Sequence, residues 1–195
     1  MRWDRLFADL EGRFDELADE EADAERADRE RVAIGAISAH ERLAGAVGRP
    51  IRVGLAGGAI VAGALRAVGP DWLLVAEGEQ RDCVLPWRSV AVVQGITAAT
   101  GPAPSGLDLR LDLRHALRGL ARDRAPVQIA LSGGAGGGPM AGPSGELIGT
   151  IDRVGADFIE MALHAAGEPR RMAAVRSVAL VPLASILFVR ATPLA

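Results

Sequence analysis

The sequence predicts a mainly β fold with helices, in which two tandem small β-barrels follow an N-terminal helical arm. Three observations predict it: helical spacing of apolar residues near the N-terminus, an alternating pattern that occurs twice later on, and a Gly- and Pro-rich stretch between the two copies. The chain has 195 residues and is 49% hydrophobic, enough to bury a core. The expected boundaries are 1–47 for the acidic arm, 48–96 for the first barrel, 97–106 for a linker, and 107–195 for a helix plus the second barrel.

The arm is expected to be helical because its apolar residues recur at steps of three and four. On a helix this spacing gathers one apolar stripe, made of Trp3, Leu6, Phe7, Leu10, Phe14 and Leu17. Residues 18–31 are nearly all Ala, Asp, Glu and Arg, which indicates a helix surrounded by solvent. Gly45, Gly48 and Pro50 then end the helical pattern.

The rest of the chain carries one pattern twice. Corresponding positions are Ile51 and Val127, Gly63 and Gly149, Asp71 and Asp157, and Leu85 and Val181. The separation between the copies grows by ten residues at two places, which indicates insertions in the second copy. They fall within 132–145 and around 168–171, and insertions collect at loop tips, so both are expected to be hairpin loops.

Each copy has the layout of an SH3- or Sm-like small barrel, a short helix followed by about five short strands. The residues that carry this layout are Ile51, Val53, Leu55, Gly57, Gly58, Gly63, Leu65 and Asp71, and in the second copy Val127, Ile129, Leu131, Gly133, Gly149, Ile151 and Asp157. They resemble the Sm-like (LSm) family, which implies two such barrels in tandem. Family members that bind RNA carry Asn after the acidic residue and a basic residue followed by Gly near the last strands. This chain has Leu73 and Pro86 at those places, so the family's RNA pocket is not expected.

The apolar stripe of the arm is the first candidate site. Trp3, Leu6, Phe7, Leu10 and Phe14 form an amphipathic face with aromatic anchors, which is typical of partner docking. Packing against the chain's own barrels, or self-pairing as an α-hairpin, is the alternative. The opening residues, together with Asp9 and Glu11, also resemble an uncharacterised actinobacterial protein family, and that resemblance implies no activity.

Arginines spaced four apart are the second candidate site. Arg110, Arg114, Arg118 and Arg122 would form one basic stripe on a helix, and Arg124 extends it. The stripe predicts a surface for phosphate or an acidic partner, or else a solvated face opposite Leu113, Leu117 and Leu120. Residues 107–113 also alternate, so a strand is an alternative there. Residues 1–47 hold a net charge of −6 and the remainder +3, so the arm could also dock on the stripe.

Neither catalysis nor a bound cofactor or metal is expected. His40 and His115 occupy equivalent places in the repeat, and no His or Cys spacing suits a metal. Cys83 has no evident activator, and the Gly-rich tract 133–145 lacks the Lys of a phosphate-binding loop. Trp72 and Trp87 are expected to pack in the barrels rather than to stack on a ligand.

We therefore expect a non-enzymatic protein-interaction scaffold that binds another protein or a second copy of itself, a homodimer for example. The alternative is a weak RNA- or DNA-binding regulator that uses the arginine stripe. The single cysteine and the charged N-terminus without an apolar signal core predict a cytoplasmic location. The longest apolar run contains Pro182 and is too short to span a membrane, so no membrane contact is expected.

Overall fold

The computed structural model describes residues 2–78, 81–103, 105–132, 146–165, 175 and 177–191, without the side chains of 2–12 and 14–19. By its internal contacts the chain divides into two units, Met1–Ala39 and His40–Ala195. Among the described residues, no helix is both long and apolar enough to cross a membrane.

The first unit is one long helix, α1 (Arg2–Gly35), which confirms the expected N-terminal helix. Its second half is held by exposed ion pairs between residues three or four apart, Arg26 with Asp23 at 2.7 Å and Arg31 with Asp28 at 3.2 Å. Such pairs contribute a few tenths of a kcal/mol each. The helix ends at Gly35, and a short turn leads to α2 (Ala39–Ala44), so the helical arm is interrupted where the sequence predicted continuous helix.

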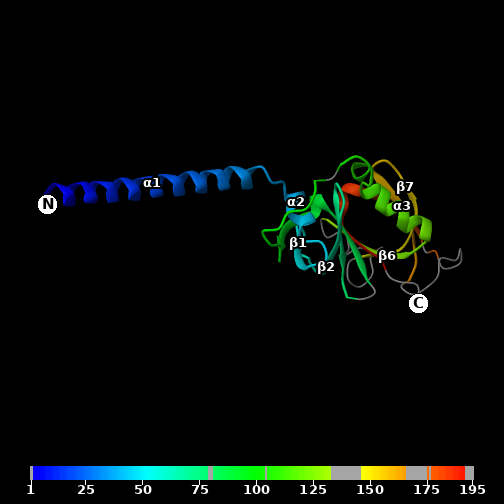
Figure 1. Ribbon diagram of the computed structural model, residues 1–195. Coiled ribbons are helices and arrows are strands. Elements are labelled where there is room, and N and C mark those ends of the chain that lie inside the picture. The colour runs from blue at the N-terminus through cyan, green and yellow to red at the C-terminus, as the bar shows by residue number, and fades with distance from the viewer. Residues whose placement is uncertain are drawn as a thin grey trace. The chain divides into compact units, whose positions relative to one another are not determined.

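Ten antiparallel strands form one sheet in the second unit (Figure 1). They are β1 (Pro50–Leu55), β2 (Ile60–Val68), β3 (Trp72–Ala76), β4 (Asp82–Pro86), β5 (Val90–Gln94), β6 (Pro126–Leu131), β7 (Leu147–Val154), β8 (Phe158–Leu163), β9 (Ser177–Pro182) and β10 (Ile186–Ala191). Their order in the sheet is β5-β1-β2-β3-β4-β10-β6-β7-β8-β9. One-turn helices η1 (Trp87–Ser89) and η4 (Leu183–Ser185) lead into β5 and β10. The mainly β class is therefore confirmed.

The first half of the sheet, β1–β5, and the second half, β6–β10, repeat each other pair by pair. Arg52 lies opposite Gln94 in the first half, and Gln128 lies opposite Arg190 in the second. Even the irregularities correspond, because the β1–β5 ladder skips one residue of β5 and the β6–β10 ladder skips the equivalent residue of β10. The pairings of the described residues do not close either half on itself. They run on through one open sheet with β5 and β9 as its edges.

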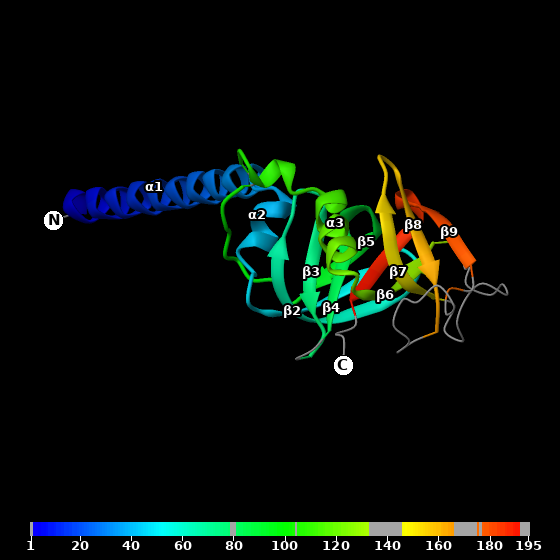
Figure 2. The ribbon, with the colours of Figure 1, turned by 90° about the vertical axis from the view of Figure 1, so that its right-hand side faces the viewer.

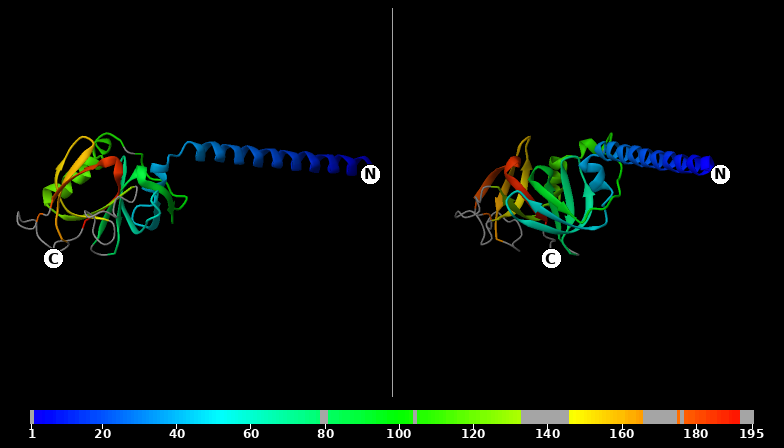
Figure 3. Two further views of the ribbon diagram at one scale, coloured as in Figure 1. Left: turned by 180° about the vertical axis from the view of Figure 1, so that it is seen from behind. Right: turned by 90° about the vertical axis from the view of Figure 1, so that its left-hand side faces the viewer.

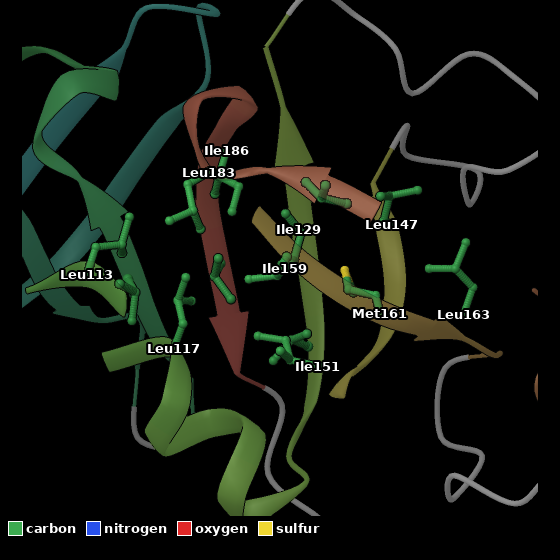
Figure 4. Close-up of a cluster of buried hydrophobic side chains, with 14 residues drawn as sticks. Leu113, Leu117, Ile129, Leu147, Ile151, Ile159, Met161, Leu163, Leu183 and Ile186 are labelled. Atoms are coloured by element: carbon green, nitrogen blue, oxygen red, sulfur yellow. The ribbon is translucent and has the colours of Figure 1, made fainter. Parts of the chain in front are cut away.

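Each half encloses its own apolar core, and β10 contributes to both. The ribbons of Figure 2 and Figure 3 show the strands and α3 (Leu113–Asp123) around these cores from three sides. The first core includes Leu43 of α2 and the inward residues of β1–β4. The second core lies under α3, and Figure 4 shows Leu113 and Leu117 directed toward the strands that carry Ile129 and Ile159. These leucines recur at four residues on one face of α3, which is why that face is buried.

The connections differ in part from the expected ones. Residues 97–103 form no strand or helix, as a linker should, yet they pack along α2, where the Gly101 amide donates to the Glu41 carbonyl at 2.8 Å. Residues 107–113 contain the one-turn helix η2 (Asp108–Arg110) and the start of α3, so the strand alternative is wrong. The insertions expected at 132–145 and around 168–171 fall almost entirely on residues 133–145 and 166–174, which lie outside the described residues. The first insertion comes between β6 and β7 and the second between β8 and β9, and both pairs of strands are antiparallel neighbours.

Candidate interaction surfaces

The two halves meet where β4 pairs with β10. Val84, Cys83 and Asp82 lie opposite Val189, Arg190 and Ala191. Side chains cross this junction in both directions, since Phe188 of β10 is buried in the first core and Val84 of β4 is buried in the second. The two halves are thus joined edge to edge, through the pairing of β4 with β10 and through buried side chains that each half places in the core of the other.

An ion-pair cluster spans the same junction. Arg190 donates from Nε and Nη2 to the two carboxylate oxygens of Glu77, at 2.6 and 3.1 Å, and from Nη1 to Oε1 of Glu146 at 3.3 Å. Its guanidinium also lies 4.2 Å from the centre of the Phe188 ring. The hydrogen bond to Glu77 raises the pKa of Arg190 above its usual range, although partial burial opposes this shift. Glu77 and Glu146 belong to different halves, so the cluster links them, and no repeated pattern in the sequence pointed to it.

The edge strands β5 and β9 expose apolar side chains. Val92 of β5 is 52% exposed, and Val178 and Leu180 of β9 are 65% and 62% exposed. Neither strand contains a charged residue. The sequence analysis did not single out these residues. A signal for them was present in the sequence of β9, which has apolar residues at consecutive positions. A strand with one solvated face alternates apolar and polar residues instead.

The arginine stripe is partly present. Arg114, Arg118 and Arg122 lie on α3, whereas Arg110 lies on η2 and does not join them on the helix. Arg114 is bound to Asp112 at 2.7 Å. Arg118, Arg122 and Arg124 are exposed and form no ion pair with the described residues. Arg124 caps the C-terminal end of α3 in a left-handed backbone conformation, with φ of 50°.

Three residues fix the start of α3. Asp112 accepts a hydrogen bond from the His115 amide at 2.9 Å, and Asp71 of the first half accepts one from the Leu113 amide at 2.7 Å. Trp72 donates from its indole nitrogen to the Leu111 carbonyl at 2.7 Å. Partial burial opposes ionisation of Asp112, but its bonds to Arg114 and His115 outweigh this and lower its pKa. Asp71 and Trp72 therefore both bind the start of α3, while Trp87 is 40% exposed.

Two open hollows lie on the described part of the second unit. One, of about 360 Å³, is mainly apolar and includes His40, Val47, Trp72 and Leu111. The other, of about 440 Å³, lies between α3 and the strands β7 and β8 and mixes charges of both signs, including an ion pair between Arg153 and Glu160 at 3.4 Å. The described residues contain no group of three His, Cys, Asp or Glu side chains placed to hold a metal.

The histidines and the cysteine of the second unit differ in exposure. His115 is exposed, whereas His164 is buried against Thr150. His164 Nδ1 lies 3.0 Å from the Ala165 carbonyl, which can only accept, so Nδ1 donates, and Nε2 forms a hydrogen bond with the Thr150 hydroxyl at 2.9 Å. Burial, helped by the charge of Glu77, raises the pKa of Cys83 to about 12, which leaves the thiol protonated.

The side chains of Trp3, Leu6, Phe7, Leu10 and Phe14 lie outside the described residues, so docking by the apolar stripe stays a prediction. No protein-family model matches the chain, and neither a curated protein nor a solved structure matches it significantly.

Proposed function

We propose that this chain is a non-enzymatic protein-interaction scaffold that binds partners by strand addition at its two sheet edges. The proposal treats the halves as tandem Sm-like small barrels and the apolar stripe of α1 as a second docking element. One observation carries it: an open ten-stranded sheet ends in two uncharged edge strands that expose the apolar side chains Val92, Val178 and Leu180.

An edge strand presents a row of unpaired amide and carbonyl groups to solvent. Proteins usually protect such edges with charges, Pro or bulges, because an unprotected edge pairs with other chains. In β9 Pro182 at its end offers such protection, and β5 has neither Pro nor charge, although the residue that the β1–β5 ladder skips makes an irregularity there. An added strand would satisfy the backbone groups and also cover Val92, or Val178 and Leu180.

Weak binding of RNA or DNA is the second candidate. It is favoured by Arg118, Arg122 and Arg124, which are exposed along the second half of α3 and at its C-terminal cap, without ion pairs to the described residues. Backbone phosphates would attract them in any sequence, and the binding would weaken steeply with salt. We place this candidate second because Asp123 lies among these arginines and the chain beyond residue 47 has a net charge of only +3.

Capture from a cell lysate on the immobilised full chain separates the two candidates. Four baits are compared, each with and without nuclease: the wild type, Val92→Lys with Leu180→Lys, Arg118→Glu with Arg122→Glu, and a chain lacking residues 1–17. The scaffold proposal expects nuclease-resistant capture that the edge substitutions or the truncation reduce. Capture that persists in both of these baits, but is lost with nuclease and in the arginine variant, would overturn it in favour of nucleic-acid binding.

A further inference from the structure

We infer that the apolar stripe of α1 docks in an apolar hollow beside α2 of a second copy of this chain, and that two copies exchange their helices in this way. The stripe consists of Trp3, Leu6, Phe7, Leu10 and Phe14, and the hollow, of about 360 Å³, is the one that includes His40, Val47, Trp72 and Leu111. The inference rests on the proposed function, because it names the surface that the second docking element binds.

The hollow lies among large apolar side chains that solvent reaches. Val47 and Leu111, which line it, are 46% and 41% exposed. Leu107 and Leu109 lie on either side of the lining residue Asp108 in the chain and are 74% and 59% exposed. Single exposed apolar residues need no explanation, but several of them around one hollow are typical of a surface that another molecule covers.

Hydrogen bonds hold the walls of this hollow in place. The indole nitrogen of Trp72 donates to the Leu111 carbonyl at 2.7 Å and so fixes one wall. Another wall contains residues 102–103, and the Gly101 amide next to them donates to the Glu41 carbonyl of α2 at 2.8 Å. A preformed apolar hollow needs no ordering when a ligand enters, which suits an amphipathic helix with aromatic anchors.

The stripe of the same chain cannot reach this hollow while α1 stays helical. α1 is continuous from Arg2 to Gly35, and a helix rises about 1.5 Å per residue. The centre of the stripe, near residue 8, therefore lies about 40 Å from Gly35. His40, which lines the hollow, is five residues beyond Gly35, and five extended residues span at most about 18 Å. A stripe of this chain that fills the hollow therefore belongs to a second copy.

The buried area favours two such contacts over one. Each aromatic side chain buries about 150–250 Å² when it is fully covered, so the aromatic residues of the stripe and the facing hollow together lose on the order of 1,000 Å². This area is at the low end for a specific interface. When each copy inserts its stripe into the other, the area doubles to about 2,000 Å², which is in the range of stable dimers. The result is a closed dimer with two-fold symmetry.

Complementation between two variants tests the exchange. Full-length protein is examined by sedimentation velocity over a range of concentrations. We expect the wild type to be a dimer, and Phe7→Glu in the stripe or Val47→Glu in the hollow to weaken association at least about tenfold, because each places a charge in an apolar contact. Ile60→Glu is the matched control, since Ile60 is 56% exposed and lies at the opposite end of β2 from Ala67 and Val68, which line the hollow. This variant should dimerise as the wild type does.

A mixture of the two variants should associate more tightly than either variant alone. In the mixed dimer the intact stripe of the Val47→Glu chain enters the intact hollow of the Phe7→Glu chain, whereas neither variant alone can form an intact contact. Recovery of association also shows that both variants are folded. If the α1 helices paired with each other instead, stripe against stripe, Val47→Glu would dimerise as the wild type does, and that result would overturn the inference.

Disulfide formation tests the position of the stripe. Leu10→Cys combined with Val47→Cys in one chain should give a covalent dimer on mild oxidation. Ala24→Cys combined with Val47→Cys should give little, because residue 24 lies about 21 Å farther along α1. The native Cys83 is buried and does not compete.

Equal yields of covalent dimer in the two variants, a disulfide closed within one chain, or a wild type that stays monomeric throughout sinks the inference. If capture from lysate that depends on residues 1–17 persists with a monomeric wild type, the scaffold proposal survives and another protein binds the stripe.

Discussion

Arg190 and Glu77 lie 113 residues apart in the chain and form two hydrogen bonds, at 2.6 and 3.1 Å, across the junction of β10 and β4. Each side chain is only 19% exposed, so water screens the pair weakly. Glu146 completes the cluster from the second half. In this geometry the positive charge of Arg190 neutralises two carboxylates that would otherwise repel each other.

Replacing Arg190 by Met should lower the free energy of unfolding by about 2 kcal/mol, because Glu77 and Glu146 lose their counter-ion in a partly buried place. Urea denaturation measures the loss. Arg153→Met is the matched control, since its pair with Glu160 is largely exposed and should contribute less than about 0.5 kcal/mol. Equal losses in the two variants would contradict a special role for the junction.

Cys83 should resist thiol reagents in the folded protein. Burial raises its pKa from 9.0 to about 12, so almost no thiolate exists at pH 8. Aromatic disulfide reagents should react only after urea unfolds the chain, and the time course of absorbance reports this. Rapid labelling of the native protein would show that β4 opens locally.

The same thiol should make stability depend on pH in the alkaline range. The unfolded chain loses its thiol proton above about pH 9 while the folded chain keeps it until about pH 12, so stability is complete below pH 9 and falls as pH rises through this window. Between pH 9 and 10 the wild type should lose about 1 kcal/mol more than Cys83→Ala, measured by urea titration at each pH. Parallel losses in the two proteins would argue against the shifted pKa.

Sequence patterns predicted the repeat well because each strand carries its own apolar alternation and turn glycines. Because the pattern repeats, the pair of Arg52 with Gln94 in the first half has its counterpart in the second half, the pair of Gln128 with Arg190. What the patterns missed is long-range. Glu77 and Arg190 come together only because β4 pairs with β10, and nothing local in either strand encodes a partner in the other half. The exposure of Leu180 was missed for the same reason, since a residue equivalent to the buried Val84 becomes exposed only where the sheet ends.

Asp71 should stabilise α3 although it belongs to the other half of the chain. Its carboxylate accepts a hydrogen bond from the Leu113 amide in the first turn of α3, so Asp71→Ala should cost about 1 kcal/mol. Asp157→Ala is the matched control, because Asp157 occupies the equivalent turn of the second half and its carboxylate accepts no hydrogen bond from a helix among the described residues. Urea denaturation of both variants decides the matter. A loss for Asp157→Ala as large as that for Asp71→Ala would mean that the turn itself, and not the helix, depends on the carboxylate.

Two glycines should respond to alanine in opposite directions. A Cβ atom at Gly149 of β7 would lie 2.1 Å from the Ala162 carbonyl oxygen of the neighbouring strand, and backbone cannot move aside without breaking the ladder. Gly149→Ala should therefore destabilise the protein by about 1–3 kcal/mol.

Gly119 lies inside α3 with nothing within 4 Å of an added Cβ, so Gly119→Ala should stabilise the protein by about 0.5–1 kcal/mol through higher helix propensity. Thermal unfolding of the two variants beside the wild type gives both signs in one experiment. A stabilised Gly149→Ala would show that β7 and β8 are farther apart in solution than in this sheet.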